Sequence, residues 1–175
     1  YVNPVTDEIR IKNFGATAVD ITNYRFCALF EYSNIPVGNV TIISGDLNLS
    51  QGEEVAVSWN SSNGFNTSAS DVGLYLPTGA FSSASSMVDF MQYGAGGQGR
   101  ENVAVSAGLW TAGNFLTGTG PWYYIGNGSA SGLDEWSDVD PQSGPYTDVR
   151  INEIDPDQPS TDTQEFIELY GEAGQ

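Results

Sequence analysis

Histidine is absent from the chain's 175 residues. Its absence excludes Ser-His-Asp and Cys-His catalysis, histidine-containing zinc sites and the usual proton shuttle of enzymes near neutral pH. Carboxylate chemistry remains, since two acids that flank a cleft can hydrolyse a glycosidic bond. The acids between 134 and 140 cluster near Trp122 and Trp136, but a solvated acidic loop explains them more simply. We therefore expect no enzyme.

Cysteine and long hydrophobic runs are also scarce. Cys27 is the one cysteine, so an internal disulfide is excluded. It lies in the apolar run 24–30, where a small core residue is a better interpretation than a nucleophile. No stretch is long and apolar enough to cross a bilayer as a helix. We therefore expect no membrane insertion.

Positively charged residues are also scarce. The chain has 5 Lys and Arg residues against 22 Asp and Glu residues, which gives a net charge of −17. Phosphate backbones and anionic lipids need clustered bases, so nucleic acid is excluded as a direct partner. The acidity is consistent with solubility through self-repulsion. A salty environment and bound divalent cations are the alternatives. Because the sequence starts at Tyr1 rather than Met, export remains open, and we expect a secreted or cell-surface protein.

What the chain does contain is turn-forming residues and short apolar alternations. Glycine (21 residues), serine, threonine and asparagine are abundant, and no long stretch has helical periodicity. This composition is typical of all-β proteins with long loops. Strands are predicted at 9–11, 19–30, 37–43, 55–59, 71–76 and 87–93. Their spacing favours a sandwich of two antiparallel sheets.

The strand pattern predicts three segments. Residues 1–94 form the β-sandwich. Residues 95–147 form a Gly- and aromatic-rich extension packed on it, since a loop section of this length is usually functional or a cover over a sheet. Residues 148–175 return to strand signals.

The two ends of the chain resemble each other. Both contain an acid, an alternating apolar pair and a terminal glycine, within 7–15 and 165–171. The matching positions are Asp7 with Glu165, Ile9 with Ile167 and Ile11 with Leu169. The second copy is preceded by an apolar strand at 149–154, which the first copy is expected to lack. A β-domain without its opening strand has an open edge.

These motifs resemble the lamin tail domain. The likeness lies in Ile151-Asn152-Glu153-Ile154 with Glu165-Phe166-Ile167-Glu168-Leu169-Tyr170, and in the downstream motifs Asn13-Phe14-Gly15, Val19-Asp20-Ile21-Thr22-Asn23-Tyr24, Leu49 to Val55 and Val88 to Gly94. It covers about residues 7–94 and 149–175, while 96–145 has no counterpart in nuclear lamins. The resemblance implies an immunoglobulin-like sandwich that serves binding or assembly, as in bacterial exported and surface proteins, and brings no catalytic residues.

Three explanations fit the repeated ends. The chain is a piece of a tandem array, or the C-terminal segment fills its own domain's slot, or it fills the slot of a neighbouring copy. Exchange between copies would grow head-to-tail filaments. Its donor residues would be Ile151, Ile154, Phe166, Ile167 and Leu169, and its acceptor edge would carry Ile9 and Ile11.

Two further hypotheses concern ligands. Trp122, Tyr123, Tyr124 and Trp136 are candidates for stacking on a surface glycan, although aromatic residues in such a section more often anchor loops to the core. Asp138, Asp140, Asp155, Asp157 and Asp162 could supply oxygen ligands to Ca²⁺, although no EF-hand loop is present and plain surface acids are the simpler interpretation.

The expected function is that of a non-catalytic structural or adhesive module. Its expected partners are copies of itself or adjacent repeats of the same protein. The alternative is a glycan-binding or accessory domain of a larger secreted multidomain enzyme. Apart from Ca²⁺, no cofactor is expected.

Overall fold

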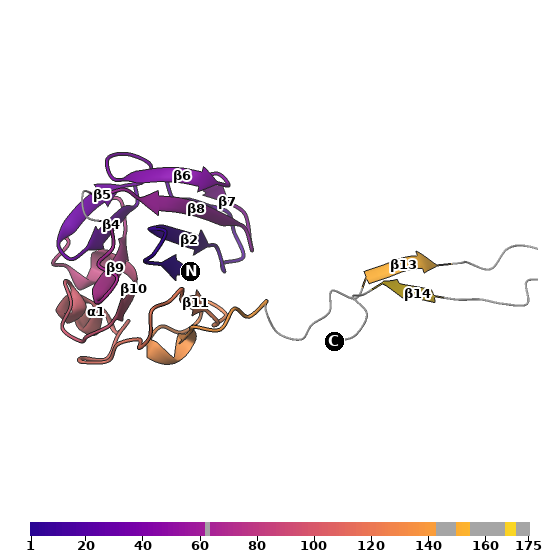
Figure 1. Ribbon diagram of the computed structural model, residues 1–175. Coiled ribbons are helices and arrows are strands. Elements are labelled where there is room, and N and C mark those ends of the chain that lie inside the picture. Colours follow the sequence, from indigo (N-terminus) through magenta and orange to yellow (C-terminus); the bar gives the residue numbers. More distant parts are fainter. Residues whose placement is uncertain (62–63, 143–149, 155–166, 171–175) are drawn as a thin grey trace, which may run out of the picture. The chain divides into compact units, whose positions relative to one another are not determined.

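Strands dominate the computed structural model of the chain, which describes residues 1–61, 64–142, 150–154 and 167–170 (Figure 1). The chain divides into two compact units, Tyr1–Val139 and Asp140–Gln175. The prediction of an all-β protein is confirmed, because antiparallel strand pairs make up most of the regular structure. The division expected at residue 94 falls inside the first unit.

The first sheet of the Tyr1–Val139 unit is four-stranded, with the order β1-β2-β8-β6. Its strands are β1 (Val2–Asn3), β2 (Glu8–Lys12), β8 (Glu54–Trp59) and β6 (Val40–Ser44). The strand predicted around Ile9 and Ile11 is therefore present as β2. Ile9 and Ile11 lie opposite Val57 and Val55 of β8.

The second sheet is also four-stranded, with the order β10-β9-β4-β5. Its strands are β10 (Met87–Tyr93), β9 (Ser70–Tyr75), β4 (Arg25–Ala28) and β5 (Glu31–Asn34). Phe26 of β4 meets Trp59 of β8 edge to face, with ring centroids 6.4 Å apart. Buried residues of both sheets therefore belong to one hydrophobic core.

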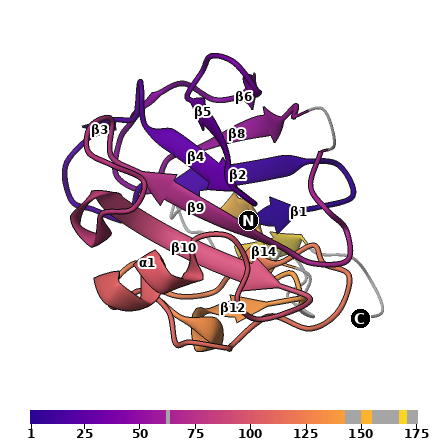
Figure 2. The ribbon, with the colours of Figure 1, turned by 90° about the vertical axis from the view of Figure 1, so that its left-hand side faces the viewer.

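Short elements complete the described chain. They are β3 (Val19–Asp20) paired with β7 (Asn48–Leu49), β11 (Tyr123–Tyr124) paired with β12 (Trp136–Ser137), the helix α1 (Glu101–Ala107), and 3-10 turns at Ala84–Ser86 and Leu133–Glu135. Figure 2 shows α1 alongside β10. In the second unit, β13 (Arg150–Ile154) pairs with β14 (Ile167–Tyr170).

The prediction of one long strand over 19–30 is wrong. The strand breaks after Asp20, whose carboxylate accepts the N–H of Thr22 at 2.8 Å, and Asn23 then takes a positive φ of 66°. Asp and Asn form such turns because their short polar side chains bond to nearby backbone. Helix α1 was not predicted, since it is only seven residues long within a glycine-rich section.

The expectation that the first copy lacks its opening strand also needs correction. Val2 and Asn3 of β1 lie opposite Ile9 and Glu8 of β2. The pairing continues at Tyr1, whose carbonyl accepts the N–H of Arg10 at 2.9 Å. A partner strand therefore lies beside the first half of β2.

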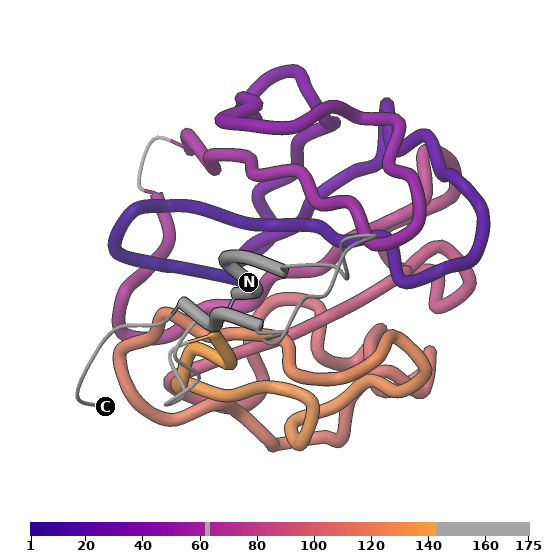
Figure 3. Tube along the Cα trace, turned by 90° about the vertical axis from the view of Figure 1, so that its right-hand side faces the viewer, coloured from indigo at the N-terminus to yellow at the C-terminus, as the bar shows by residue number. Residues whose placement is uncertain are grey.

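Residues 95–139 bond to the edge strand of each sheet on one side of the first unit. Trp122 exchanges two backbone hydrogen bonds with Val2 of β1, at 2.8 and 2.9 Å. Leu116 bonds in the same way to Gln92 and Gly94 at the end of β10, each at 2.9 Å. In Figure 3 this segment, coloured from salmon to orange, lies below the N-terminus. Bonding of this kind protects sheet edges from pairing with other chains.

Candidate functional site

A pocket of about 530 Å³ lies beside the β11–β12 hairpin. This volume is within the range of small-molecule sites. Its walls combine apolar, hydroxyl and acidic side chains, from Phe115, Leu116, Thr117, Trp122, Leu133, Asp134, Trp136, Ser137 and Asp138. Two of the four aromatic residues predicted to bind a glycan, Trp122 and Trp136, are among them.

The hairpin places Trp136 at the pocket. Tyr124 lies opposite Trp136 and Tyr123 opposite Ser137. The turn Leu133–Glu135 leads the chain into β12, and the N–H of Ile125 donates to the carbonyl of Glu135 at 2.8 Å. The exposed acids Asp134 and Asp138 therefore flank the half-buried Trp136 on either side in sequence.

The four predicted aromatic residues do not form one binding platform. Trp122 is 1% exposed and stacks on Tyr93, with ring centroids 4.3 Å apart. Tyr123 packs against Tyr1 at 5.1 Å. Tyr124 packs between Phe14 and Trp136, at 5.3 and 5.7 Å. The loop-anchor interpretation therefore accounts for Trp122, Tyr123 and Tyr124, whereas Trp136 lines the pocket and stays partly exposed.

The pocket's polar groups suit a neutral ligand rich in hydroxyl groups. Asp134 and Asp138 can accept hydrogen bonds, and the hydroxyls of Thr117 and Ser137 can donate or accept them. No base is among the residues that line the pocket, so the carboxylates of Asp134 and Asp138 would repel a bound carboxylate or phosphate. The Nε1–H of Trp122 is buried without an acceptor among the described residues.

The predicted calcium ligands are only partly described. Asp138 is exposed, and a carboxylate oxygen of Asp140 accepts the N–H of Gln142 at 2.8 Å. Within residues 1–61 and 64–142 no group of three or more potential ligands surrounds a common point. Asp155, Asp157 and Asp162 lie outside the described residues, so calcium binding stays a prediction.

At Ile9 the structure contradicts the predicted acceptor edge. Because Ile9 lies between Val2 and Val57 and is 4% exposed, no incoming strand can pair with it. Ile11 is half-buried and lies beyond the part of β2 that pairs with β1. Of the two predicted acceptor residues, Ile11 is therefore the one without a paired residue in β1.

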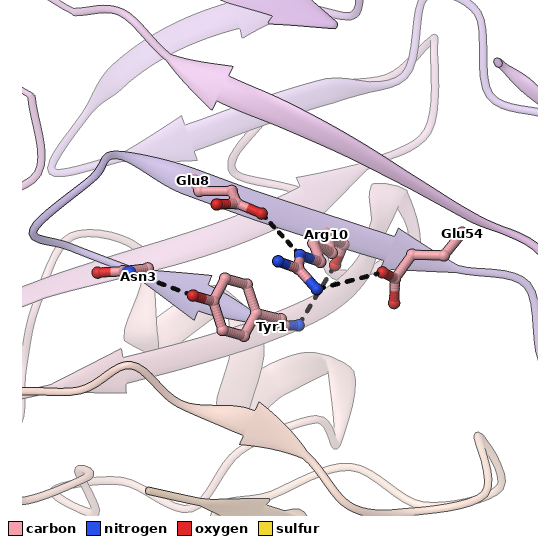
Figure 4. A network of polar contacts seen from close by, with 5 residues as sticks. All are labelled: Tyr1, Asn3, Glu8, Arg10 and Glu54. Atoms are coloured by element: carbon pink, nitrogen blue, oxygen red, sulfur yellow. Dashed lines mark hydrogen bonds and ion pairs between the residues drawn. The ribbon is translucent and has the colours of Figure 1, made fainter. Parts of the chain in front are cut away.

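Arg10 ties β1 to this edge. Its guanidinium bonds to Glu8 at 2.6 Å, reaches Glu54 at 3.9 Å and lies 4.4 Å over the ring of Tyr1 (Figure 4). The hydroxyl of Tyr1 accepts a bond from the side-chain amide of Asn3 at 3.1 Å. Of these contacts, the one between Arg10 and the ring of Tyr1 adds to the backbone pairing that holds the N-terminal strand against β2.

The predicted donor residues pair with one another. In the β13–β14 hairpin, Ile151 lies opposite Leu169 and Ile154 opposite Ile167. Phe166, the fifth predicted donor, lies outside the described residues. A two-stranded hairpin is marginally stable by itself in water. A hairpin of this kind gains stability when it packs against a further surface.

The two terminal hairpins have the same register. Ile9 lies opposite Val2, and Ile167, its match in the second copy, lies opposite Ile154. One residue further along, Arg10 bonds to Tyr1, and Glu168 lies opposite Glu153. The sequence carries the same signal, because Val2-Asn3-Pro4 corresponds to Ile154-Asp155-Pro156. This correspondence, which the sequence interpretation missed, aligns β1 with the end of β13.

Two buried polar residues that sequence reasoning missed hold the glycine-rich loop after β10. Asp71 accepts the N–H groups of Leu29 and Arg100, at 2.8 and 3.1 Å, and burial raises the pKa of its carboxyl. Opposite it, Gln92 donates to the carbonyl of Asn114 at 2.6 Å. An acid inside the apolar run 70–76 was the available signal.

The described part of the chain offers no reactive thiol. Cys27 is fully buried, and burial raises the pKa of its thiol to about 12. Thiols of this kind are inert because the thiolate is the nucleophile. The core position predicted for Cys27 is therefore confirmed.

No helix in the described residues is long and apolar enough to span a membrane. Comparisons with protein-family models, with curated proteins and with solved structures gave no match. The functional argument therefore rests on the residues and their geometry.

Proposed function

We propose that this chain belongs to a non-catalytic, secreted or cell-surface protein built from tandem immunoglobulin-like β-sandwich domains of the lamin-tail type. The observation that carries the proposal is the shared register of the terminal hairpins, β1–β2 and β13–β14. Equivalent hairpins at both ends support an array in which each domain opens with such a hairpin. Such an array serves a structural or adhesive role, alone or beside a catalytic domain of a larger protein.

The acidic surface supports this role. A net charge of −17 keeps neighbouring domains and chains apart through repulsion. Each sheet edge on the β1 and β10 side bonds to residues 95–139, which opposes lateral pairing between arrays. The proposed array would therefore resist lateral strand pairing along the β1 and β10 edges.

Strand exchange between copies is less well supported than a tandem array. The acceptor position at Ile9 is already paired by Val2, and the donor residues Ile151 and Ile154 already face β14. Exchange would have to displace both sets of backbone bonds. A tandem array leaves them in place.

The solution mass of the chain separates these two possibilities. We expect light scattering to give the same mass for the unaltered chain and for the double variant Ile151→Asp with Ile154→Asp, because neither hairpin has to open. Oligomers of the unaltered chain that disappear in this double variant would contradict the proposal and establish strand donation.

A second candidate function is binding of a neutral glycan in the pocket beside Trp136. The observation that favours it is the combination of a partly exposed indole with flanking carboxylates and hydroxyls. Aromatic faces pack on the apolar faces of sugar rings, while the polar groups bond to sugar hydroxyls. Binding of this kind would give an array its adhesive property.

A further inference from the structure

Two of the chain's five bases meet on one cluster of aromatic rings in the Tyr1–Val139 unit. The guanidinium of Arg25 lies 4.4 Å over the ring of Phe81, and that of Arg100 lies 5.0 Å from the ring of Phe30 and 5.7 Å from that of Tyr32. Tyr32 and Phe81 are in ring contact at 4.3 Å. We name these five residues the arginine–aromatic patch.

The patch is accessible from solvent. Phe30 is 55% exposed and Tyr32 is 40% exposed, while Phe81 is half-buried beneath them. Exposed aromatic residues together with arginine are enriched where proteins bind partners. The patch therefore has the composition of an interaction surface.

Phe30 lies in a strained backbone conformation. Leu29 and Phe30 form the two-residue turn between Ala28 and Glu31, and both take positive φ values, 46° and 66°. Asn-Gly is the usual sequence of such turns, because bulky L-residues are disfavoured there. Since the ring of Phe30 is largely exposed, burial does not compensate for the strain. A conformation of this kind is typical of sites that contact a ligand.

Hydrogen bonds hold the two arginine side chains in place, but no carboxylate of the described residues forms an ion pair with either of them. Arg25 donates to the carbonyls of Leu76, Thr78 and Gly79, at 2.8 to 3.0 Å, and Arg100 donates to the hydroxyl of Tyr32. Both ion pairs of the described residues involve Arg10, so neither patch arginine is paired with a carboxylate there. The Nε–H of Arg100 has no acceptor among the described residues. In a chain with 22 acids, the patch is a cationic exception.

We propose that the arginine–aromatic patch docks an acidic, proline-containing peptide segment of another copy of this protein. Carboxylates of the segment pair with the guanidinium groups. Proline rings pack on Phe30 and Tyr32, as extended proline segments do in aromatic grooves. The chain's own sequence at 155–159, Asp155-Pro156-Asp157-Gln158-Pro159, has this chemistry. The inference adds a specific contact between arrays to the proposed structural role.

The test uses a fluorescein-labelled peptide of residues 155–165, titrated with the full chain and followed by fluorescence anisotropy. We expect saturable binding that weakens with added salt, because charge pairing contributes to it. Arg100→Gln should weaken binding at least tenfold. Lys12→Gln, which removes a cation lying 5.4 Å from the ring of Phe14, is the matched control and should bind as the unaltered chain does.

A variant of the turn at Leu29 and Phe30 distinguishes loss of the peptide contact from unfolding of the protein. Leu29→Asn with Phe30→Gly suits the positive φ values and should raise the Tm by a few degrees while weakening peptide binding at least tenfold. A control peptide with Asp155→Asn and Asp157→Asn should bind at least tenfold more weakly. Absence of binding to the unaltered chain would overturn the proposal. Equal binding by the Arg100 and Lys12 variants would do the same.

Discussion

Replacing Trp122 by alanine is expected to lower the free energy of unfolding by about 3–5 kcal/mol, a range typical of fully buried tryptophan. Its ring is 1% exposed and stacks on Tyr93, so the change removes a large contact area and leaves a cavity. Its backbone also pairs with Val2, so loosening at Trp122 reaches the edge of the first sheet. A loss of this size is a large fraction of a typical domain's stability.

Trp136 provides the matched control. Its ring is half-buried, so Trp136→Ala should cost about 1–2 kcal/mol by lost apolar burial. Urea denaturation of both variants measures the two losses. A smaller loss for Trp122→Ala than for Trp136→Ala would contradict the anchoring role of Trp122.

The Trp136→Ala variant also tests the glycan hypothesis. On a glycan array, Trp136→Ala should remove any signal of the unaltered chain, since Trp136 is the indole that is both partly exposed and in the pocket. A signal that survives this change would exclude the pocket as the glycan site.

Replacing Asp71 by alanine has the second largest expected effect, a loss of about 2–4 kcal/mol at neutral pH. The change leaves the N–H groups of Leu29 and Arg100 buried without their acceptor, and each such group costs about 1–3 kcal/mol. Asp71→Asn keeps one acceptor oxygen and should cost less. Thermal unfolding of both variants gives the comparison, and a neutral effect of Asp71→Ala would contradict the structure of this site.

The pH dependence of Asp71 has a definite sign. Burial raises the pKa of its carboxyl in the folded state, so the unfolded chain releases this proton at a lower pH than the folded chain does. The part of the stability that depends on protonation of Asp71 is therefore lost as the pH rises from the ordinary aspartate range through the raised value. Asp71→Asn should show a shallower fall in stability over this interval. A steeper fall in stability for Asp71→Asn than for the unaltered chain would contradict the raised pKa of Asp71.

Local patterns predicted the strands more reliably than they predicted where strands end. The alternation at Ile9 and Ile11 and the run 87–93 gave β2 and β10, because apolar alternation reports directly on a buried face. The run 19–30 was misjudged because its apolar content hid two turns, at Asn23 and at Leu29 with Phe30. Bulky residues at positive φ are held by tertiary contacts that no local pattern shows.

The site was harder to predict than the fold for the same reason. Trp122 and Trp136 both line one pocket, but burial of Trp122 depends on Tyr93, which lies 29 residues earlier. The meeting of Arg25 with Arg100 likewise depends on contacts between distant segments. By contrast, the match of Val2-Asn3-Pro4 with Ile154-Asp155-Pro156 was readable in the sequence and became evident once the hairpin registers were known.

The tandem-array account is tested most directly by extending β1. Because Tyr1 corresponds to Glu153, a second copy of the residues 149–152 placed before Tyr1 should put an isoleucine opposite Ile11, as Ile151 lies opposite Leu169. Burial of this isoleucine should add about 1–2 kcal/mol and raise the Tm by about 3–6 °C. The same extension with aspartate in place of the isoleucine is the control and should give no rise. Equal Tm values for the two extended chains would contradict the equivalence of the hairpins and the array built on it.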